Sequence, residues 1–274
     1  MDRIRKYGLG FFVALVFFAV FIQVFNIRIS DNTANANNSG SIVMRADNYE
    51  ILGGENYYAK MPMASTTKIM TALIVVENCL MDEKVVVTSE SVGIEGSSIY
   101  LKIGETLTVK ELLYGLMLRS GNDSAMALAI HTAGSEEAFV NMMNLRASSL
   151  GLKNTNFCNP HGLDDKNHYT CCYDLCYISS FAMKYPQFKE IVGTKFVAIG
   201  NNEAKRYFQN KNKILSMYEG GNGIKTGFTK KSGRCLVASA ERNGVLLISA
   251  VLNHGDMWND CMKLLDSGFD KINA

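Results

Sequence analysis

The sequence predicts an α/β fold in which an antiparallel sheet packs against a group of helices. Strand-like patterns occur near both ends of the chain, over Ile42–Tyr58 and over Arg234–Leu252, and Asn243-Gly244 within the second region is a strong hairpin signal. Between them, Ser65–Met183 carries apolar residues mostly at helical spacing. Strands from the two ends are therefore expected to pair in one sheet, with the helical group inserted between them in the chain.

The N-terminal part of the chain is predicted to enter a membrane. Basic residues precede Leu9–Phe25, a run that only Gly10 and Gln23 interrupt. At about 1.5 Å per residue, the run nearly matches the roughly 30 Å hydrocarbon core of a bilayer. The basic residues would keep the N-terminus inside and place the rest of the protein outside. We expect four parts: a basic segment 1–8, a membrane segment 9–29, a flexible linker 30–41 and a globular domain 42–274.

Whether the membrane segment is retained is left open by the sequence. Ala34-Asn35-Ala36 fits a signal-peptidase site, so that cleavage would release the protein. The apolar run is longer than the usual core of a signal peptide, which favours a retained anchor. The expected location is the outer side of the cell membrane, or the exterior if the segment is removed.

Charge and cysteine content limit the possible partners. A net charge of +2 and 20% charged residues, without a basic stripe, predict no nucleic-acid partner. Seven cysteines leave at least one unpaired. A metal site or a disulfide is conceivable within one group of neighbours, but we favour reduced thiols in the core and expect no metal or other cofactor. This group comprises Cys158, His161, His168, Cys171, Cys172 and Cys176.

The segment Ser65-Thr66-Thr67-Lys68 opens an almost wholly apolar helical run that extends to Val76. Residues three apart lie on one face of a helix, so Ser65 and Lys68 are predicted to project into the same cleft. A serine hydroxyl needs a nearby base to become a nucleophile, and a buried lysine with a lowered pKa can supply one. The pattern is degenerate, and alone it is also compatible with an ordinary helix start.

A second polar motif, Ser120-Gly121-Asn122, is predicted to lie in a break between two helices. Thr108 and Glu111 form a capping-box pattern that starts the helix before the motif, and the next helical run covers 125–132. A loop between two rigid helices can fix side chains for chemistry, although these residue types also form plain turns. Further helices are expected over 139–150, 171–183 and 258–269.

The third motif, Lys225-Thr226-Gly227, follows a glycine cluster at 220–223 and is predicted to open a strand beside the C-terminal hairpin. Gly227 would allow a ligand to lie close to the backbone. Its alternative interpretation is a surface turn with a solvated lysine.

In this order the three motifs resemble the set found in penicillin-binding proteins and class A β-lactamases. With Gly121 in the second motif, the chain is similar to the low-molecular-mass D-alanyl-D-alanine carboxypeptidases, peptidase family S11. The resemblance extends from about Ile42 to the C-terminus and implies the serine β-lactamase/penicillin-binding fold. The matching stretches are Ala64–Ala72, Arg119–Asp123, Asn159–Leu163 and Lys225–Thr229.

The resemblance also implies an activity, which is removal of the terminal D-alanine from peptidoglycan stem pentapeptides, and it implies acylation by β-lactam antibiotics. Ser65 would be the nucleophile and Lys68 its general base. Ser120, assisted by Lys225, would pass a proton to the leaving D-alanine.

The remaining roles concern substrate binding. Asn122 would hydrogen-bond the peptide backbone of the substrate, and Lys225 and Thr226 would face its terminal carboxylate. Gly227 lies on the strand along which substrate would extend. The backbone N–H groups of Ser65 and Phe228 would form the oxyanion hole. An arginine that some relatives carry after the next strand is absent from Leu252–Asp256.

Several alternatives share these motifs. A D,D-endopeptidase or transpeptidase would form the same acyl-enzyme. A β-lactamase needs a glutamate that directs water, but Asn159–Asp174 contains none, and the nearest similar stretch, Glu137–Asn141, lies within a predicted helix. A penicillin-sensing domain would keep Ser65 but turn over no peptide. Many relatives carry a further domain and a terminal helix, which are not expected here, so a retained N-terminal helix would be the anchor.

Overall fold

The computed structural model describes residues 39–200 and 205–273, and its elements confirm the predicted α/β class. The expectations for Leu9–Phe25 and for the cleavage site at Ala34-Asn35-Ala36 lie outside the described residues. Within the described ranges, no helix combines the length and apolarity that crossing a bilayer requires.

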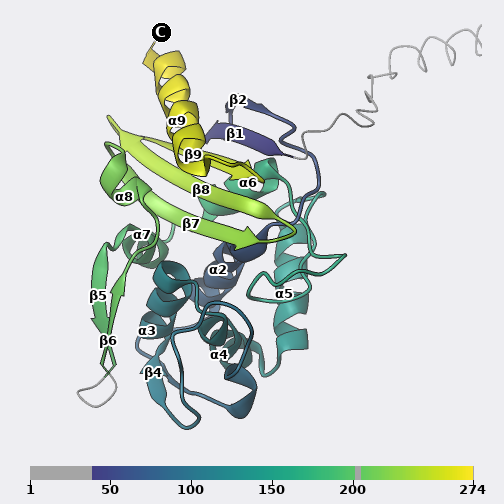
Figure 1. The fold of residues 1–274 in the computed structure, drawn as a ribbon, viewed down its shortest axis with the longest axis vertical. Helices are drawn as coiled ribbons and strands as arrows, with labels where there is room; N and C mark the ends of the chain where they lie inside the picture. Colours follow the sequence, from purple (N-terminus) through teal and green to yellow (C-terminus); the bar gives the residue numbers. More distant parts are fainter. Residues whose placement is uncertain (1–38, 201–204, 274) are drawn as a thin grey trace, which may run out of the picture. The chain divides into compact units, whose positions relative to one another are not determined.

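One antiparallel sheet brings together the two ends of the described chain (Figure 1). Its strand order is β2-β1-β9-β8-β7, so β1 near the start pairs with β9 near the end, as predicted. β1 already begins at Gly40, so the last two residues of the predicted 30–41 linker belong to the sheet. The strands are β1 Gly40–Arg45, β2 Ile51–Glu55, β7 Gly221–Thr229, β8 Gly233–Arg242 and β9 Val245–Leu252.

The predicted hairpin at Asn243-Gly244 is confirmed. These two residues join β8 to β9 and have φ values of 51° and 78°. Positive φ at both central positions is what a tight type I′ turn requires, and Asn and Gly adopt it at low cost. The glycine cluster at 220–223 differs from the prediction, because most of it lies inside β7 instead of preceding it.

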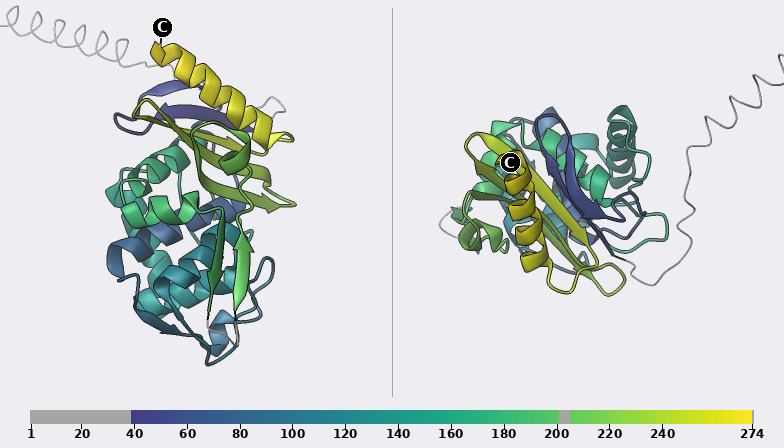
Figure 2. Two further views of the ribbon diagram at one scale, coloured as in Figure 1. Left: turned by 90° about the vertical axis from the view of Figure 1, so that its left-hand side faces the viewer. Right: turned by 90° about the horizontal axis from the view of Figure 1, so that it is seen from above.

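The sheet separates two apolar cores, because alternate residues of each strand face opposite sides. Val43, Leu236 and Leu247 pack with helix α9, Met257–Asn273, on one face. Ile42 and Val237 belong to the larger core on the other face, which also contains the helical group. Figure 2 shows α9 and the helical group on opposite sides of the sheet. The candidate site described below lies on the side of the sheet that packs against the helical group.

The helical group contains the helices predicted for it with small shifts at their ends, together with one helix that was not predicted, α7. The capping box is present, since Thr108 accepts from the Glu111 N–H and the Glu111 carboxylate accepts from the Thr108 N–H. Gly134 ends α4 in the left-handed conformation, with φ of 83°. The helices are α2 Lys68–Asn78, α3 Val109–Tyr114, α4 Asn122–Ala133, α5 Glu136–Ser149, α6 Cys172–Ala182 and α7 Pro186–Gly193.

Several short elements were not predicted, because each is too brief for a periodic pattern to be read. Two small two-stranded antiparallel sheets, β3–β4 and β5–β6, flank the helical group, and α8 leads into β7. Their bounds are β3 Lys84–Val86, β4 Thr106–Thr108, β5 Phe196–Ile199, β6 Arg206–Gln209 and α8 Ile214–Met217. Short turns of other helix types are η1 Ala64–Thr67, η2 Ser89–Ser91 and η3 Gly115–Arg119.

The capping box offers a test of this part of the fold. Replacing Thr108 by Ala removes the acceptor for the Glu111 N–H, and we expect a loss of about 1 kcal/mol in the free energy of unfolding. Urea denaturation measures the change. Thr106→Ala is the matched control, because Thr106 is exposed and makes no side-chain hydrogen bond among the described residues. Equal effects of the two substitutions would contradict the role of the cap.

Candidate active site

The first motif lies where η1 passes into α2. Ser65 is in η1 and Lys68 is the first residue of α2, and Lys68 Nζ lies 3.1 Å from Ser65 Oγ. The two side chains therefore meet, as the three-residue spacing predicted. Ala64, directly before Ser65, has a φ of 46°, a strained value for a residue with a side chain. Its carbonyl accepts from Thr67 Oγ1 at 2.8 Å, which helps to hold the turn that presents Ser65.

Lys68 is completely buried, and three oxygen atoms from separate segments surround its amine. Besides Ser65 Oγ, these are Asn122 Oδ1 at 2.7 Å and the backbone carbonyl of His161 at 2.5 Å. Burial lowers the pKa of Lys68 well below 10.5, and the positive charges of Lys225 and Lys211 lower it further. The nearby Asp123 carboxylate acts in the opposite direction, but it does not hydrogen-bond this amine in the described structure, and the pKa stays lowered.

The second motif forms the junction between η3 and α4. Ser120 ends η3 in the left-handed conformation, with φ of 66°, and its side chain is almost buried. A Cβ at Gly121 would lie 2.7 Å from Asp123 Oδ1 and 2.8 Å from Ser124 Oγ, so glycine fits this packed turn. No hydrogen bond of the described residues joins Ser120 Oγ to Lys68 or Lys225, so the predicted proton relay is not closed in this conformation.

Asn122 has internal partners that the sequence did not reveal. Its Oδ1 accepts from Lys68, and its Nδ2 donates to the Glu95 carbonyl at 2.5 Å. One N–H of the amide is left for a ligand, because a carboxamide has two. The next residue, Asp123, accepts from the N–H groups of Ile99 and Leu101, so the start of α4 also fixes the loop before β4.

The third motif lies on β7, the edge strand of the sheet. Lys225 is opposite Val237 and shares its face, so it points into the core of the helical group, where it is 2% exposed. Burial, and the nearby charge of Lys211, lower the pKa of Lys225 to about 7. Its Nζ donates to the Thr226 carbonyl at 2.9 Å. The structure thus brings a second buried lysine close enough to Lys68 to affect the latter's pKa.

Gly227 brings β7 against the nucleophile. A Cβ at this position would lie 3.1 Å from both Ser65 N and the Met63 carbonyl, so a larger residue would displace η1. Strand alternation places Thr226 and Phe228 on the other side of β7 from Lys225, and Phe228 is 65% exposed. The side chain of Phe228 therefore points away from the face of β7 that carries Lys225, and only its backbone is available for a contact with Ser65.

The stretch Asn159–Leu163 was one of the segments that resemble the family, but its sequence indicated no role. The structure shows that it contacts the first motif. The His161 carbonyl accepts a hydrogen bond from Lys68 Nζ, and the Pro160 carbonyl accepts one from Thr71 Oγ1 at 2.6 Å. Asn159 Oδ1 accepts from the Gly162 N–H at 2.7 Å and fixes this turn. Gly162 has a φ of 93°, and a Cβ there would overlap the Ala64 carbonyl at 2.0 Å. The Asn-Pro-His-Gly sequence was the one signal that could have indicated this turn and its contacts with the first motif.

His168 links the same loop to the first motif. Its Nδ1 accepts from the Cys158 N–H at 2.9 Å, so in the neutral ring the proton lies on Nε2 and can be donated to Thr67 Oγ1 at 2.7 Å. Burial lowers the pKa of His168 to about 4, in agreement with a neutral ring. This histidine is therefore a positioning residue. All seven cysteines are free thiols in the structure, and Cys79 and Cys158 are only partly buried.

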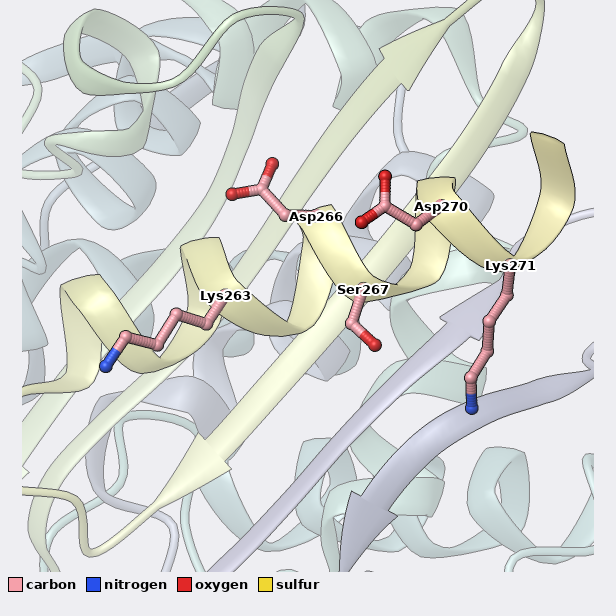
Figure 3. Close-up of a pocket in the computed structure, with 5 residues that line it drawn as sticks. All are labelled: Lys263, Asp266, Ser267, Asp270 and Lys271. Atoms are coloured by element: carbon pink, nitrogen blue, oxygen red, sulfur yellow. The ribbon is translucent and has the colours of Figure 1, made fainter. Parts of the chain in front are cut away.

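A separate hollow on the outer face of α9 does not contribute to this site. Figure 3 shows that the side chains lining this hollow project from α9. Two of them form hydrogen bonds that attach the helix to neighbouring segments. Asp266 accepts from the Tyr218 hydroxyl at 2.6 Å, and Lys271 donates to the Leu52 carbonyl at 2.5 Å. The nucleophile is on the opposite side of the sheet.

Comparison with known proteins decides the family. A model of the family Peptidase_S11, D-alanyl-D-alanine carboxypeptidase, matches residues 28–256. The chain belongs to this family. The resemblance inferred from the motifs is therefore confirmed, and so is the fold, because the structure superposes on solved structures of D,D-peptidases.

Two of these structures illustrate the extent of the likeness. The Streptomyces K15 DD-transpeptidase has a TM-score of 0.80 at 32% identity, with 87% of this chain and 99% of that chain covered. The D-alanyl-D-alanine carboxypeptidase of Mycobacterium tuberculosis H37Rv also has a TM-score of 0.80, at 28% identity, with 88% and 95% covered.

Among curated relatives, D-alanyl-D-alanine carboxypeptidase DacF of Bacillus subtilis (strain 168) is 36% identical over 217 residues. That match covers 77% of this chain but 56% of the relative, so the chain spans little more than half of that protein's length. The D-alanyl-D-alanine carboxypeptidase of Streptomyces sp. (strain K15) is also 36% identical, and 78% of its length is matched.

The buried lysine of β7 generates a prediction about pH. In the folded protein the pKa of Lys225 is about 7, against 10.5 for an ordinary lysine. Between these values the unfolded chain binds more protons, so stability rises with pH; below pH 7 both states are protonated and this contribution is constant. Over pH 7.0–8.5, we expect the rise in the free energy of unfolding to be about 1 kcal/mol per pH unit smaller in Lys225→Met.

Urea unfolding at several pH values measures how steeply the free energy of unfolding changes with pH. Lys263→Met on α9 should keep the wild-type slope, and an unchanged slope in Lys225→Met would contradict the burial argument.

Proposed function

We propose that the protein is a serine-type D-alanyl-D-alanine carboxypeptidase that removes the terminal D-alanine from peptidoglycan stem pentapeptides. The observation that supports this most strongly is the buried, deprotonation-prone amine of Lys68 at 3.1 Å from Ser65 Oγ. The names of the relatives support the substrate class.

The hydrogen-bond geometry around Lys68 suits a general base. A neutral lysine amine has two N–H donors and one lone pair. The donors are directed to Asn122 Oδ1 and the His161 carbonyl, which leaves the lone pair for the hydroxyl proton of Ser65. Ser65 then attacks the carbonyl between the two D-alanines while Lys68 takes its proton, and a tetrahedral intermediate forms.

Breakdown of the intermediate requires a proton on the leaving amine. We assign this transfer to Ser120, assisted by Lys225, and the side chains must move to complete the relay, because Lys225 Nζ donates to the Thr226 carbonyl in this conformation. The C–N bond breaks, D-alanine leaves, and the acyl chain stays on Ser65 until water, deprotonated by Lys68, hydrolyses the ester. The Ser65 and Phe228 N–H groups would stabilise the oxyanion, and the close contact at Gly227 supports their proximity.

Substrate would lie along the free edge of β7 and extend the sheet by one strand. The remaining N–H of Asn122 would bind its backbone. Lys225 and Thr226 leave opposite sides of β7, so they would approach the terminal carboxylate from either side of the open strand edge. Lys211 adds positive charge on the same side, since it lowers the pKa of both buried lysines. It is a candidate for carboxylate binding in a chain without the arginine that some relatives have. A β-lactam would occupy the same place and acylate Ser65.

Transpeptidation is a second candidate, because the match to the Streptomyces K15 DD-transpeptidase covers 99% of that chain. The acyl-enzyme is common to both reactions, and only the acceptor differs. A β-lactamase receives less support from the geometry: Glu137 is exposed on the first turn of α5, and Asn159–Asp174 has no glutamate.

We also propose that Leu9–Phe25 anchors the enzyme to the cell membrane, with the catalytic domain outside. Its length and the preceding basic residues support this arrangement. The N-terminal sequence of the mature protein is the measurement: a retained Met1 or Asp2 is expected, and a start at Asn37 would contradict the anchor.

The activity is tested with diacetyl-L-lysyl-D-alanyl-D-alanine by following free D-alanine. Wild type should release it, Ser65→Ala should lose at least about 10⁴-fold, and Lys68→Met should lose roughly 10²–10⁴-fold while it keeps the fold. Ser216→Ala, an exposed serine of α8, is the control and should retain full activity.

The same assay separates the alternatives. Adding a D-amino acid acceptor would form a new peptide if the transpeptidase proposal holds. Penicillin labelling of Ser65 without D-alanine release would favour a sensor, and rapid penicillin turnover would favour a β-lactamase. Normal labelling of Lys68→Met would contradict the general-base assignment.

A further inference from the structure

Three ligand-type side chains meet at the end of α2 and α4 that lies away from the candidate active site. They are Cys79, which follows α2, Glu83 in the turn before β3, and His131 in the last turn of α4. Their Sγ, carboxylate O and ring N atoms all lie within 4.8 Å of one another. The contact between α2 and α4, visible in Figure 1, is what brings these separate segments together.

The three side chains are held in place by neighbouring groups. Glu83 accepts from the Leu80 N–H at 2.7 Å through one carboxylate oxygen, and the other lies 2.9 Å from His131 Nε2. The Cys79 thiol lies 3.4 Å from Thr132 Oγ1. All three residues are partly buried. The ligand atoms are thus positioned by the backbone turn and the helix end, and they remain reachable from solvent.

We propose that Cys79, Glu83 and His131 form a site for a divalent metal ion of the zinc type. Thiolate, imidazole and carboxylate are the ligands that zinc uses, and three protein ligands leave a fourth tetrahedral position for water. Tetrahedral bonds of about 2.0–2.3 Å separate neighbouring ligand atoms by roughly 3.3–3.8 Å. A pair of ligand atoms at the full 4.8 Å would need to close by about 1.0–1.5 Å, and Glu83 and His131, at 2.9 Å, would need to open by roughly 0.5 Å, which side-chain rotations can provide.

Charge also favours the ion at this place. Zn²⁺ with one thiolate and one carboxylate is neutral overall, so a partly buried site carries no net charge. Binding displaces the thiol proton of Cys79 to solvent. It also requires His131 Nε2 to give up the proton that it directs to the Glu83 carboxylate, so that in the metal-bound ring only Nδ1 is protonated. Each helix end also presents the negative end of its dipole to a cation.

The position of the site suggests what the metal would do. α2 carries Lys68 at its first turn and α4 carries Asn122 at its first turn, and the ion would join the opposite ends of the same two helices. A ligand that binds only the folded state stabilises it. The ion would therefore act as a clamp on the helix pair, and it would also shield the Cys79 thiol from alkylation. This inference does not depend on the proposed peptidase activity.

The sequence did not indicate this group, because His131 is separated from Cys79 and Glu83 by β3, η2, β4, α3 and η3 in the chain. The group that the sequence did suggest for a metal is engaged otherwise in the structure. His168 bonds to Thr67 and the Cys158 N–H, while Cys171, Cys172 and Cys176 are buried among apolar residues.

Zinc binding to the purified, chelator-treated full chain tests the proposal. We expect one equivalent of zinc, a rise in Tm of roughly 5 °C or more at saturating zinc, and a thiolate-to-metal absorption band when cobalt replaces zinc. Cys79→Ser and His131→Gln should lose all three. Cys158→Ser, another partly buried thiol, and His254→Gln, another histidine paired to a carboxylate, are the matched controls and should keep them.

Alkylation of Cys79 gives a readout that needs no variant. Zinc should slow its reaction with iodoacetamide at least about tenfold, as followed by peptide mass spectrometry, and Cys158 should react at an unchanged rate. Wild type without stoichiometric zinc, a band that survives Cys79→Ser, or a band lost in Cys158→Ser would each overturn the site.

Discussion

The placement of the Lys68 amine in the interior is the constraint on which the rest of the site depends. A charged ammonium without a carboxylate partner is costly to bury, so the protein surrounds this nitrogen with oxygen atoms and lowers its pKa. The three oxygens come from η1, from the start of α4 and from the turn at His161. These segments are far apart in the chain, and a shift in any of them would leave a buried polar group without its partner.

The second buried lysine extends this arrangement to the sheet. Lys225 points from β7 towards the helical group, and its charge disfavours a charge on Lys68. Gly227, two residues later on the same face, permits the backbone of β7 to approach Ser65. The edge strand thus contributes both an electrostatic effect on the base and the surface along which an extended peptide can be placed. The α9 side of the sheet has only a supporting role, because its residues pack in a separate core.

Local signals explain what the sequence could predict. The Asn243-Gly244 turn, the Thr108–Glu111 capping box and the end of α4 at Gly134 follow from the conformational preferences of a few adjacent residues. The proximity of Ser65 and Lys68 follows from helical spacing. Local preferences could not predict the contacts of His161 and Gly162 with the first motif, because these are tertiary contacts between distant segments. The hydrogen-bond partners of Asn122 are also distant in the chain. The same reason applies to the meeting of Cys79 and Glu83 with His131, and to the position of Lys211 near the two buried lysines.

The most direct test of this account is the titration of Lys68 itself. Lysine side chains labelled with ¹³C at Cε report their own charge by NMR, and Lys68→Met identifies the signal that belongs to this residue. The account predicts that the missing signal titrates well below the ordinary lysine pKa of 10.5 and shifts when Ser65 is acylated by penicillin. A Lys68 signal that stays charged up to about pH 10, with the protein folded, would contradict the role of this amine as the base.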